Sequence, residues 1–406
     1  MAPRVLVIAD DLSGAAEIAA IGARYGLAAA VQRDLIDCAA SPTAAAATGV
    51  PAAEQKTGGV LVIDTDTRLL DPDIAADGVR RAIRHVRPAD FDLIYKKTDS
   101  VLRGPILAEV EAIADELKRD AVLLVAQNPS RGRTITGGEY RIAGVPLHET
   151  AFARDPEYPA RSCKAAELLG RSYRRTPSCL SPASELPTAG LFVGEAENDD
   201  HVRDWAGRAA RSMSTVLPAG GADFFAALLE RLGLAASKPA IERPPPGRTL
   251  FVCGSASAYT SELMDRARRE KVPVCPMPQH TAGAAALIEN WRADVCRALD
   301  TGGRALVVIA RPLDRSPGAP QRLQAALAEL VARVLASHDV DKLMLEGGAT
   351  ASAVCRKMGW NRFEVDGELA SAGVVQMRVL DPVTGIGRRI YIKPGSYAWP
   401  EAVWQG

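Results

Sequence analysis

Charged and polar side chains follow three short apolar runs in the N-terminal half of the sequence. Such clusters of carboxylates, hydroxyls and cationic groups can bind a small polar ligand and move a proton on it. The runs and the clusters that follow them are 5–9 with Asp10 and Asp11, 60–63 with Asp64 to Arg68, and 93–95 with Lys96 to Gly104. Each run is typical of a buried parallel strand. Because ligands bind at the carboxyl ends of strands in open α/β sheets, the clusters are candidates for a ligand site.

The adjacent carboxylates Asp10 and Asp11 are unsuited to holding a phosphate, because like charges repel. They suit sugar hydroxyls, a Mg²⁺ ion or the role of a general base. The alternative is structural, since Asp11 or Ser13 could cap the helix expected after them. Both interpretations stay open.

The segment from Lys96 to Gly104 reads KKTDSVLRG and is a dense polar cluster. The planar guanidinium of Arg103 can hold a carboxylate through two parallel hydrogen bonds. Ser100 can donate to the same carboxylate, and Asp99 can accept from a hydroxyl. A solvated charged turn is the alternative, but the position after a buried strand favours a binding site.

The segment DTDTR, from Asp64 to Arg68, resembles the nucleophile motif of haloacid dehalogenase-like phosphatases. A phosphatase that uses Asp64 and Asp66 is therefore a competing hypothesis. The lysine and acidic-pair motifs that such an enzyme also needs are not evident later in the chain. Arg68 is interpreted either as a surface charge or as a ligand-binding residue.

Two turns in the C-terminal half combine a strand, small residues and a helix start. Free backbone N–H groups at a helix N-terminus bind phosphate well, although each turn alone could be only a tight connection. Neither a GxxxxGK[ST] nor a GxGxxG pattern is present. The turns contain Gly254, Ser255 and Ser257 in the first, and Gly347, Gly348, Ala349 and Thr350 in the second.

The 406 residues favour two domains, and alternating strand and helix patterns predict an α/β fold with mainly parallel sheets flanked by helices. The segment 237–248 holds four prolines and precedes a new strand, so it is the expected linker. The predicted domains are 1–236 and 249–406. Residues 373–393, near the end of the chain, are expected to form antiparallel strands.

The charge balance, the cysteines and the lack of a long apolar stretch limit which partners and which cellular location we expect for the protein. Basic and acidic residues number 49 each, so no overall field favours nucleic acid or an anionic membrane. Seven scattered cysteines without CxxC spacing argue against zinc sites and disulfides, and they fit a reducing cytoplasm. No apolar stretch reaches the ~18 residues that span a bilayer. We expect a cytoplasmic protein without a targeting segment.

Taken together, the motifs resemble the four-carbon acid-sugar kinase family, which includes threonate, erythronate and 3-oxo-tetronate kinases. The matching segments are IADDLSGAAEIA near the start, YKKTDSVLRGPILAEVEA around residue 100, GRTITGGEYRIAGVPLHETAFARDP from Gly132, CGSAS, EGGATASAVCRKMGW, the segment Val365 to Gly373, and IKPGSY. They run in family order and cover nearly the whole chain.

The resemblance implies that domain 1–236 binds the sugar acid and domain 249–406 binds ATP, with Mg²⁺ on the phosphates and transfer in the cleft between them. The acid-sugar pocket would be lined by Asp10, Asp11, Arg68, Lys96, Lys97, Asp99, Ser100, Arg103 and Gly104. The nucleotide would be held by Gly254, Ser255, Ser257, Gly347, Gly348, Ala349, Thr350 and Gly395. The base would be Asp10, Asp11 or Asp99, and no protein residue is predicted to bind a metal.

Ala349 departs from the family pattern, because many members have an acidic residue in this glycine turn. A base or metal ligand is therefore missing at that position, which keeps a third hypothesis open: a non-catalytic sensor of sugar acid and nucleotide. The identity of the acid and of the phosphorylated hydroxyl stays open. The expected partners are the two small molecules, and a homodimer is compatible with the sequence.

Overall fold

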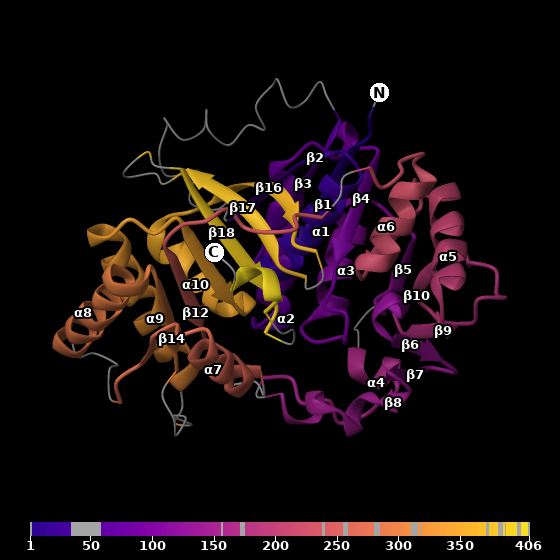
Figure 1. The fold of residues 1–406 in the computed structure, drawn as a ribbon. Coiled ribbons are helices and arrows are strands. Elements are labelled where there is room, and N and C mark those ends of the chain that lie inside the picture. Colours follow the sequence, from indigo (N-terminus) through magenta and orange to yellow (C-terminus); the bar gives the residue numbers. More distant parts are fainter. Residues whose placement is uncertain are drawn as a thin grey trace. The chain divides into compact units, whose positions relative to one another are not determined.

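The computed structural model of the chain divides into two compact units, Met1–Lys238 and Pro239–Gly406. Each unit holds a mainly parallel β-sheet with helices packed on it (Figure 1), so the predicted α/β fold class is confirmed. The structure describes residues 2–33, 58–155, 157–170, 175–237, 240–254, 259–279, 285–309, 316, 318–370, 373–380, 385, 387–395 and 399–404.

The strands of the N-terminal unit lie in the order β2-β3-β1-β4-β11-β5-β10-β9, and all neighbours are parallel. Their bounds are β1 Arg4–Ala9, β2 Ala28–Arg33, β3 Gly59–Asp64, β4 Leu93–Lys97, β5 Ala121–Val125, β9 Pro177–Leu180, β10 Gly190–Gly194 and β11 Val216–Gly220. Every residue of β4 and β5 is buried, as expected for central strands covered on both faces.

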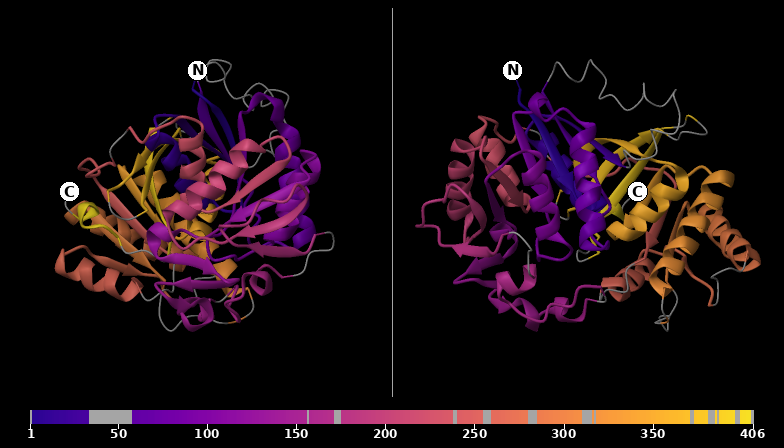
Figure 2. Two further views of the ribbon diagram at one scale, coloured as in Figure 1. Left: turned by 90° about the vertical axis from the view of Figure 1, so that its right-hand side faces the viewer. Right: turned by 180° about the vertical axis from the view of Figure 1, so that it is seen from behind.

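Helices cover both faces of this sheet, as Figure 2 shows. The ring of Tyr95 in β4 packs against Phe224 and Phe225 of α6, with centroids 6.1 and 5.2 Å away. The next residue, Lys96, contacts Glu109 of α3, so α6 and α3 lie on opposite faces. The helices of this unit are α1 Leu12–Arg24, α2 Pro72–His85, α3 Ile106–Glu116, α4 Ala165–Leu169, α5 Asp199–Arg211 and α6 Ala222–Arg231.

A small antiparallel sheet follows β5 in the chain. It consists of β6 Arg133–Thr136, β7 Glu139–Ile142 and β8 Val145–Pro146. Tyr140 of β7 is fully buried and belongs to the same apolar core as α2 and α3. The small sheet is therefore anchored to the body of the N-terminal unit.

The C-terminal unit has the strand order β13-β14-β12-β15-β18-β17-β16. The pairs β18–β17 and β17–β16 are antiparallel, and the other neighbours, including β15 and β18, are parallel. The structure thus contains the antiparallel strands expected near the end of the chain. The strands are β12 Thr249–Cys253, β13 Val274–Pro276, β14 Arg304–Val308, β15 Lys342–Glu346, β16 Arg362–Glu368, β17 Val375–Leu380 and β18 Gly387–Lys393. The helices are α7 Tyr259–Arg269, α8 Ala285–Gly302, α9 Ala319–Ser337 and α10 Gly348–Met358.

Part of the proline-rich segment 237–248 is fixed to the C-terminal unit. The N–H of Ile241 donates to the Glu368 carbonyl, and the Ile241 carbonyl accepts from Ala370 N–H, at 2.8 and 2.9 Å. These two bonds give Ile241 a strand-like partner at Leu369.

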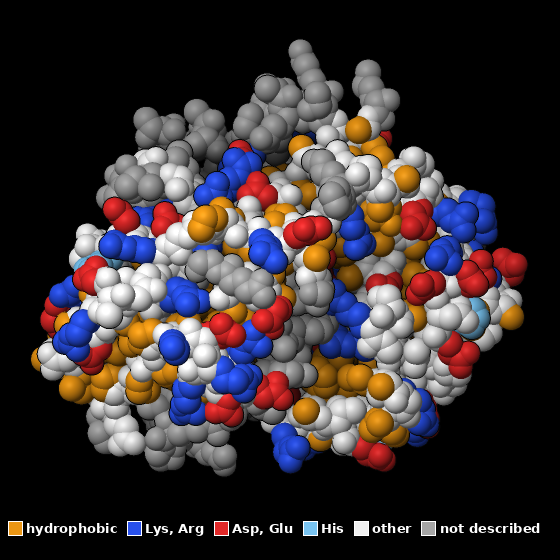
Figure 3. All heavy atoms as spheres, in the orientation of Figure 1, with side chains coloured by type: hydrophobic (Ala, Val, Ile, Leu, Met, Phe, Trp, Pro, Cys, Tyr) orange, Lys and Arg blue, Asp and Glu red, His pale blue; other side chains and the backbone are white. Residues whose placement is uncertain are grey.

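The surface carries both signs of charge in alternation, as Figure 3 shows for one face. This pattern agrees with the formal net charge of zero. None of the helices in the described segments is long and apolar enough to cross a membrane.

Candidate functional site

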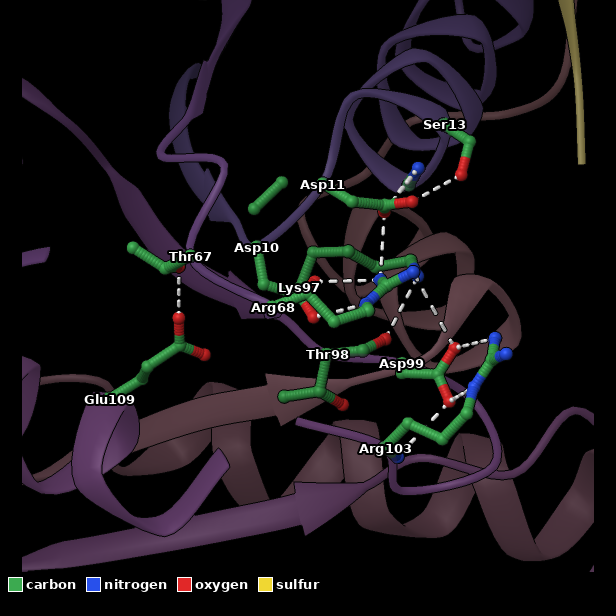
Figure 4. A network of polar contacts seen from close by, with 12 residues as sticks. Asp10, Asp11, Ser13, Thr67, Arg68, Lys97, Thr98, Asp99, Arg103 and Glu109 are labelled. Carbon is green, nitrogen blue, oxygen red and sulfur yellow. Dashed lines mark hydrogen bonds and ion pairs between the residues drawn. The ribbon is translucent and has the colours of Figure 1, made fainter. Parts of the chain in front are cut away.

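The carboxyl ends of β3, β1 and β4 are neighbours, because Ala9 of β1 pairs with Asp64 on one side and Lys97 on the other. The clusters that follow these strands therefore meet at one edge of the sheet. Figure 4 shows the resulting network, in which Asp10, Arg68 and Asp99 come from three separate segments. The structure thus brings Asp10, Asp11, Arg68, Asp99 and Arg103 together, whereas Lys96, Asp64 and Asp66 have other partners.

Arg68 lies at the centre of this network. Its Nε and Nη2 donate to the two oxygens of Asp10 at 2.7 and 3.0 Å, and Nη2 also donates to Asp11 at 2.7 Å. Asp99 lies 3.8 Å from Nη1. The side chain is only 16% exposed. Arg68 is therefore a largely buried cation held by three carboxylates rather than a surface charge.

The two aspartates after β1 have several contacts. Asp11 caps α1, since its Oδ1 accepts the Gly14 N–H at 2.8 Å and its Oδ2 accepts the Ser13 hydroxyl. Burial acts to raise the pKa of Asp10, but the positive charges of Arg68 and two lysines outweigh it and hold the pKa below its ordinary value. Asp10 is therefore ionised at neutral pH, and Asp11 combines a capping role with its place in the network.

Arg103 holds the carboxylate of Asp99 through two hydrogen bonds. Nε and Nη2 of Arg103 donate to the two Asp99 oxygens at 2.9 and 2.8 Å, and Nη1 donates to Asp155 at 2.8 Å. Burial acts to raise the pKa of Asp99, but Arg103 and Arg68 together hold it well below its usual range. The edge of Arg103 that could grip a ligand carboxylate is thus occupied by Asp99, while one hydrogen on each Nη remains for a further acceptor.

The two lysines at the end of β4 point to opposite faces of the sheet, as alternate strand residues do. Lys96 Nζ lies 3.0 Å from Glu109 of α3, and Lys97 Nζ lies 3.5 Å from Glu17 of α1. Lys96 is fully buried, so its charge acts on the site through the protein.

Glu109 and Gly104 shape the loop that carries Arg68. Glu109 also accepts a hydrogen bond from the hydroxyl of Thr67, the residue before Arg68. Gly104 has a φ of 92°, and a Cβ there would lie 3.2 Å from the Arg68 carbonyl oxygen. Glycine therefore allows the close approach of the two loops.

Several residues of the site come from the segment 131–158, which contains the quoted family motif at 132–156. This segment includes the small sheet and the turns after it. Its polar contacts with the site are Arg131 with Glu17, Arg133 with Ser100 Oγ, Tyr140 with the Ser100 carbonyl, Asp155 with Arg103, and Tyr158 with the Arg68 carbonyl. The family motif pointed to Arg133, Tyr140 and Asp155, whereas Arg131 and Tyr158 lie outside it and no signal in the sequence pointed to them.

Asp64 is placed differently from a phosphatase nucleophile. Its side chain is 0% exposed and lies 3.1 Å from Arg33 Nε, directly across the β2–β3 register. Asp66 lies 3.5 Å from Nη2 of the same arginine. A nucleophile needs access to the phosphorus atom, so this geometry gives the phosphatase hypothesis no support.

In the C-terminal unit, the ends of β12, β15 and β18 are neighbours and carry glycines. A Cβ on Gly254 would lie 2.0 Å from Thr350 Oγ1, so glycine is required for this close contact. Gly347 has a φ of 91° and precedes α10, whose first turn contains Gly348 and Ala349. Gly395 follows β18, whereas Ser255 and Ser257 lie outside the described residues. The α10 N-terminus thus offers backbone N–H groups at this edge.

A buried ion pair lies at the same strand ends. Lys393 Nζ is 3.2 Å from Glu346 Oε2, and Trp399 Nε1 donates to the same oxygen at 2.9 Å. Burial lowers the pKa of Lys393, and Glu346 opposes this shift. Because Lys393 also donates to the Pro394 carbonyl, the pair fixes the turn that leads to Gly395.

Both halves of the chain match models of known domain families. A sugar-binding N-terminal domain matches residues 5–228, and a nucleotide-binding C-terminal domain matches residues 250–397. The chain is 27% identical to a D-threonate kinase of Salmonella typhimurium, over 93% of this chain and 81% of that protein. It is also 27% identical to a D-erythronate kinase of Heliobacterium modesticaldum (90% and 88% covered) and 24% identical to a 3-oxo-tetronate kinase of Haemophilus influenzae (90% and 91%).

Solved structures show the same fold. A Salmonella typhimurium protein described as a putative tRNA synthase aligns with a TM-score of 0.72 at 19% identity, covering 100% of this chain and 98% of the other. A Haemophilus influenzae protein aligns with a TM-score of 0.66 at 20% identity, covering 97% of each chain. With its sugar-binding and nucleotide-binding domains and these curated relatives, the chain belongs to the four-carbon acid-sugar kinase family.

Proposed function

We propose that the protein is an ATP-dependent kinase that phosphorylates a hydroxyl group of a small sugar acid. The observation that carries this proposal is the Arg68 network, which gathers carboxylates and cations from three strand ends. Carboxylates accept hydrogen bonds from sugar hydroxyls, and cations attract the acid group. The curated relatives phosphorylate four-carbon acids, which fits a site of this chemistry.

We propose Asp10, Asp11 and Asp99 as the candidates for the residue that orients and deprotonates the acceptor hydroxyl. Phosphoryl transfer depends mainly on positioning and on neutralising charge, so an ionised carboxylate of low pKa can serve by accepting the hydroxyl proton. Arg68 and Arg103 keep Asp10 and Asp99 ionised and fix their orientation. We propose that six further residues line the substrate site: Arg68, Lys96, Lys97, Ser100, Arg103 and Gly104.

We propose that the glycine turns around Gly254, Gly347 and Gly348, with Thr350 and Gly395, hold the triphosphate through backbone N–H groups. Among the described residues, no three His, Cys, Asp or Glu side chains are placed to hold a metal ion. We propose that Mg²⁺ binds to the phosphates of ATP, where it would neutralise charge on them. The interdomain cleft, the cytoplasmic location and a homodimer also stay predictions.

Ala349 keeps the sensor as a second candidate, because it supplies no acidic side chain at the start of α10. The two functions differ in turnover. A sensor would bind sugar acid and ATP without forming ADP, whereas the kinase would release ADP in proportion to phosphorylated acid.

The test is ADP release from the purified chain with ATP, Mg²⁺ and, in turn, D-threonate, D-erythronate and 3-oxo-tetronate. We expect turnover with at least one acid and none without it. Calorimetric titration of the same acids follows binding independently. Binding without turnover would establish the sensor. If none of the three acids binds or is turned over, the proposal is refuted.

A further inference from the structure

We propose that Arg133 holds the carboxylate of the sugar acid, with Lys97 and Ser100 beside it. The inference rests on the proposed function and adds the orientation of the substrate. The acid group would lie at the end of the site formed by β6, and the hydroxyl groups would lie toward Asp10 and Asp99. Arg103 would then support the site by holding Asp99.

The first argument is the difference in pairing between Arg133 and the two arginines Arg68 and Arg103. Arg68 and Arg103 each have a carboxylate oxygen within 3 Å. Arg133 is only 9% exposed, yet in the described part of the chain its polar partner is the hydroxyl of Ser100 and no carboxylate lies within ion-pair distance. A guanidinium buried without a counterion is unfavourable. A ligand carboxylate would supply the missing charge.

The second argument is the distribution of charge around Arg133. Lys97 and Arg131 both contact Glu17, at 3.5 and 3.0 Å. Burial acts to raise the pKa of Glu17, but these two cations and then Arg133 hold it below its ordinary value. Three cationic side chains thus act on this one carboxylate, which leaves the region attractive to an anion.

The other end of the site has an excess of negative charge. There, Arg68 and Arg103 are surrounded by four carboxylates, namely Asp10, Asp11, Asp99 and Asp155. Carboxylates repel an acid group but accept hydrogen bonds from hydroxyls. A molecule with one carboxylate and several hydroxyls therefore fits in a single orientation, with its carboxylate at Arg133 and its hydroxyls at the aspartates.

The third argument is the distance between the two ends. Asp99 belongs to the carboxylate-rich end, and the adjacent Ser100 is the hydrogen-bond partner of Arg133. Adjacent Cα atoms lie about 3.8 Å apart. A short chain of carbon atoms can therefore reach both ends at once, which suits a four-carbon acid.

The position of Arg133 is fixed by its neighbours. It begins β6 and pairs with Ile142 of β7. The ring of Phe152 lies 5.9 Å from its guanidinium carbon and 5.4 Å from that of Arg103. The Phe152 ring thus contacts both cations and helps to hold each in place.

The test compares Arg133→Gln with Arg141→Gln in the full-length chain. Arg141 lies on neighbouring β7, is 41% exposed and pairs with Glu139, so it is a matched control outside the site. The probe is whichever of D-threonate, D-erythronate and 3-oxo-tetronate the wild type phosphorylates fastest. Arg133→Gln loses hydrogen bonds to the charged carboxylate, so the Kd of this acid should rise about 10- to 100-fold. Binding of D-threitol, which lacks the carboxylate, should not change.

Arg133→Lys keeps the charge but not the planar fork, so we expect a smaller loss of acid affinity. Circular dichroism spectra and urea unfolding of the same samples report whether each variant is folded. Acid affinities within twofold of the wild type in both Arg133 variants would overturn the inference and leave the kinase standing. A wild type that binds and phosphorylates none of the three acids would overturn both.

Discussion

At the scale of single residues, the candidate site is a series of alternating charges. Asp11, Arg68, Asp99, Arg103 and Asp155 follow one another through space, each within 4 Å of the next. Each charge in such a series is stabilised by its neighbours. Removing one member leaves the others buried with fewer partners.

Arg68→Ala should therefore destabilise the protein by about 3 kcal/mol or more, because Asp10 and Asp11 lose their main cation. The measurement is urea unfolding followed by circular dichroism. Arg80→Ala is the control, since Arg80 pairs with the exposed Asp77 and should contribute less than about 1 kcal/mol. Equal losses in the two variants would mean that the Arg68 network contributes nothing special to stability.

Arg103→Lys tests what the Asp99 fork does. A lysine keeps the charge but not the two parallel hydrogen bonds, so Asp99 should lose its fixed orientation. We expect kcat/KM to fall on the order of tenfold for an acid substrate and equally for the matching polyol. Steady-state kinetics with both substrates measure this. A loss confined to the acid would instead mean that Arg103 binds the carboxylate, as the sequence alone had predicted.

At the scale of elements, the pairing of β2 with β3 places Asp64 beside Arg33 in a fully buried position. Burial raises the pKa of Asp64 to about 7, Asp66 and Asp11 add to the rise, and Arg33 opposes it. A carboxyl group whose pKa is higher in the folded state binds more protons there than when unfolded. Its contribution to stability therefore falls as pH rises from about 4 to about 7.

Asp64→Asn removes this titration. The free energy of unfolding of the variant, relative to wild type, should rise across that pH range by about 4 kcal/mol at most and then level off. Chemical unfolding at pH 5, 6, 7 and 8 measures the trend, and the exposed Asp77→Asn is the control. A pH-independent difference between Asp64→Asn and wild type would show that Asp64 is ionised throughout.

Elements also show where sequence patterns succeed and fail. Short apolar runs predicted β1, β3 and β4, and these strands carry the candidate site. The patterns did not predict β11, because Pro218 and Gly220 argue against a central strand. They also missed β2, whose alanines have low strand propensity. Arg33 therefore could not be recognised as the partner of Asp64.

The site itself was predictable as a set of segments but not as a set of contacts. The rule for strand ends located Asp10, Arg68 and Asp99. Which cation meets which carboxylate depends on side-chain directions and on the small sheet, which is folded back from a distant part of the sequence. The fork of Arg103 onto Asp99, and the place of Arg133, could be found only in the structure.

At the scale of the whole molecule, each unit has its own apolar core and its own polar strand edge. The residues proposed to bind the sugar acid lie in Met1–Lys238, and the glycine turns proposed to bind ATP lie in Pro239–Gly406. Substitutions in one unit should therefore change the affinity for one ligand and leave the affinity for the other.

Gly348→Asp is the sharpest test of this separation. Gly348 begins α10, where an aspartate is favourable for the helix because it faces the positive end of the helix dipole. The variant should therefore fold, while its negative charge repels the phosphates and its side chain blocks the approach of backbone N–H groups. We expect ATP affinity to fall about tenfold or more, with sugar-acid affinity unchanged, in calorimetric titrations of the full-length chain. Gly348→Ala adds a Cβ without charge and serves as the matched control. If the aspartate variant binds ATP as tightly as the wild type does, the triphosphate does not lie at the start of α10.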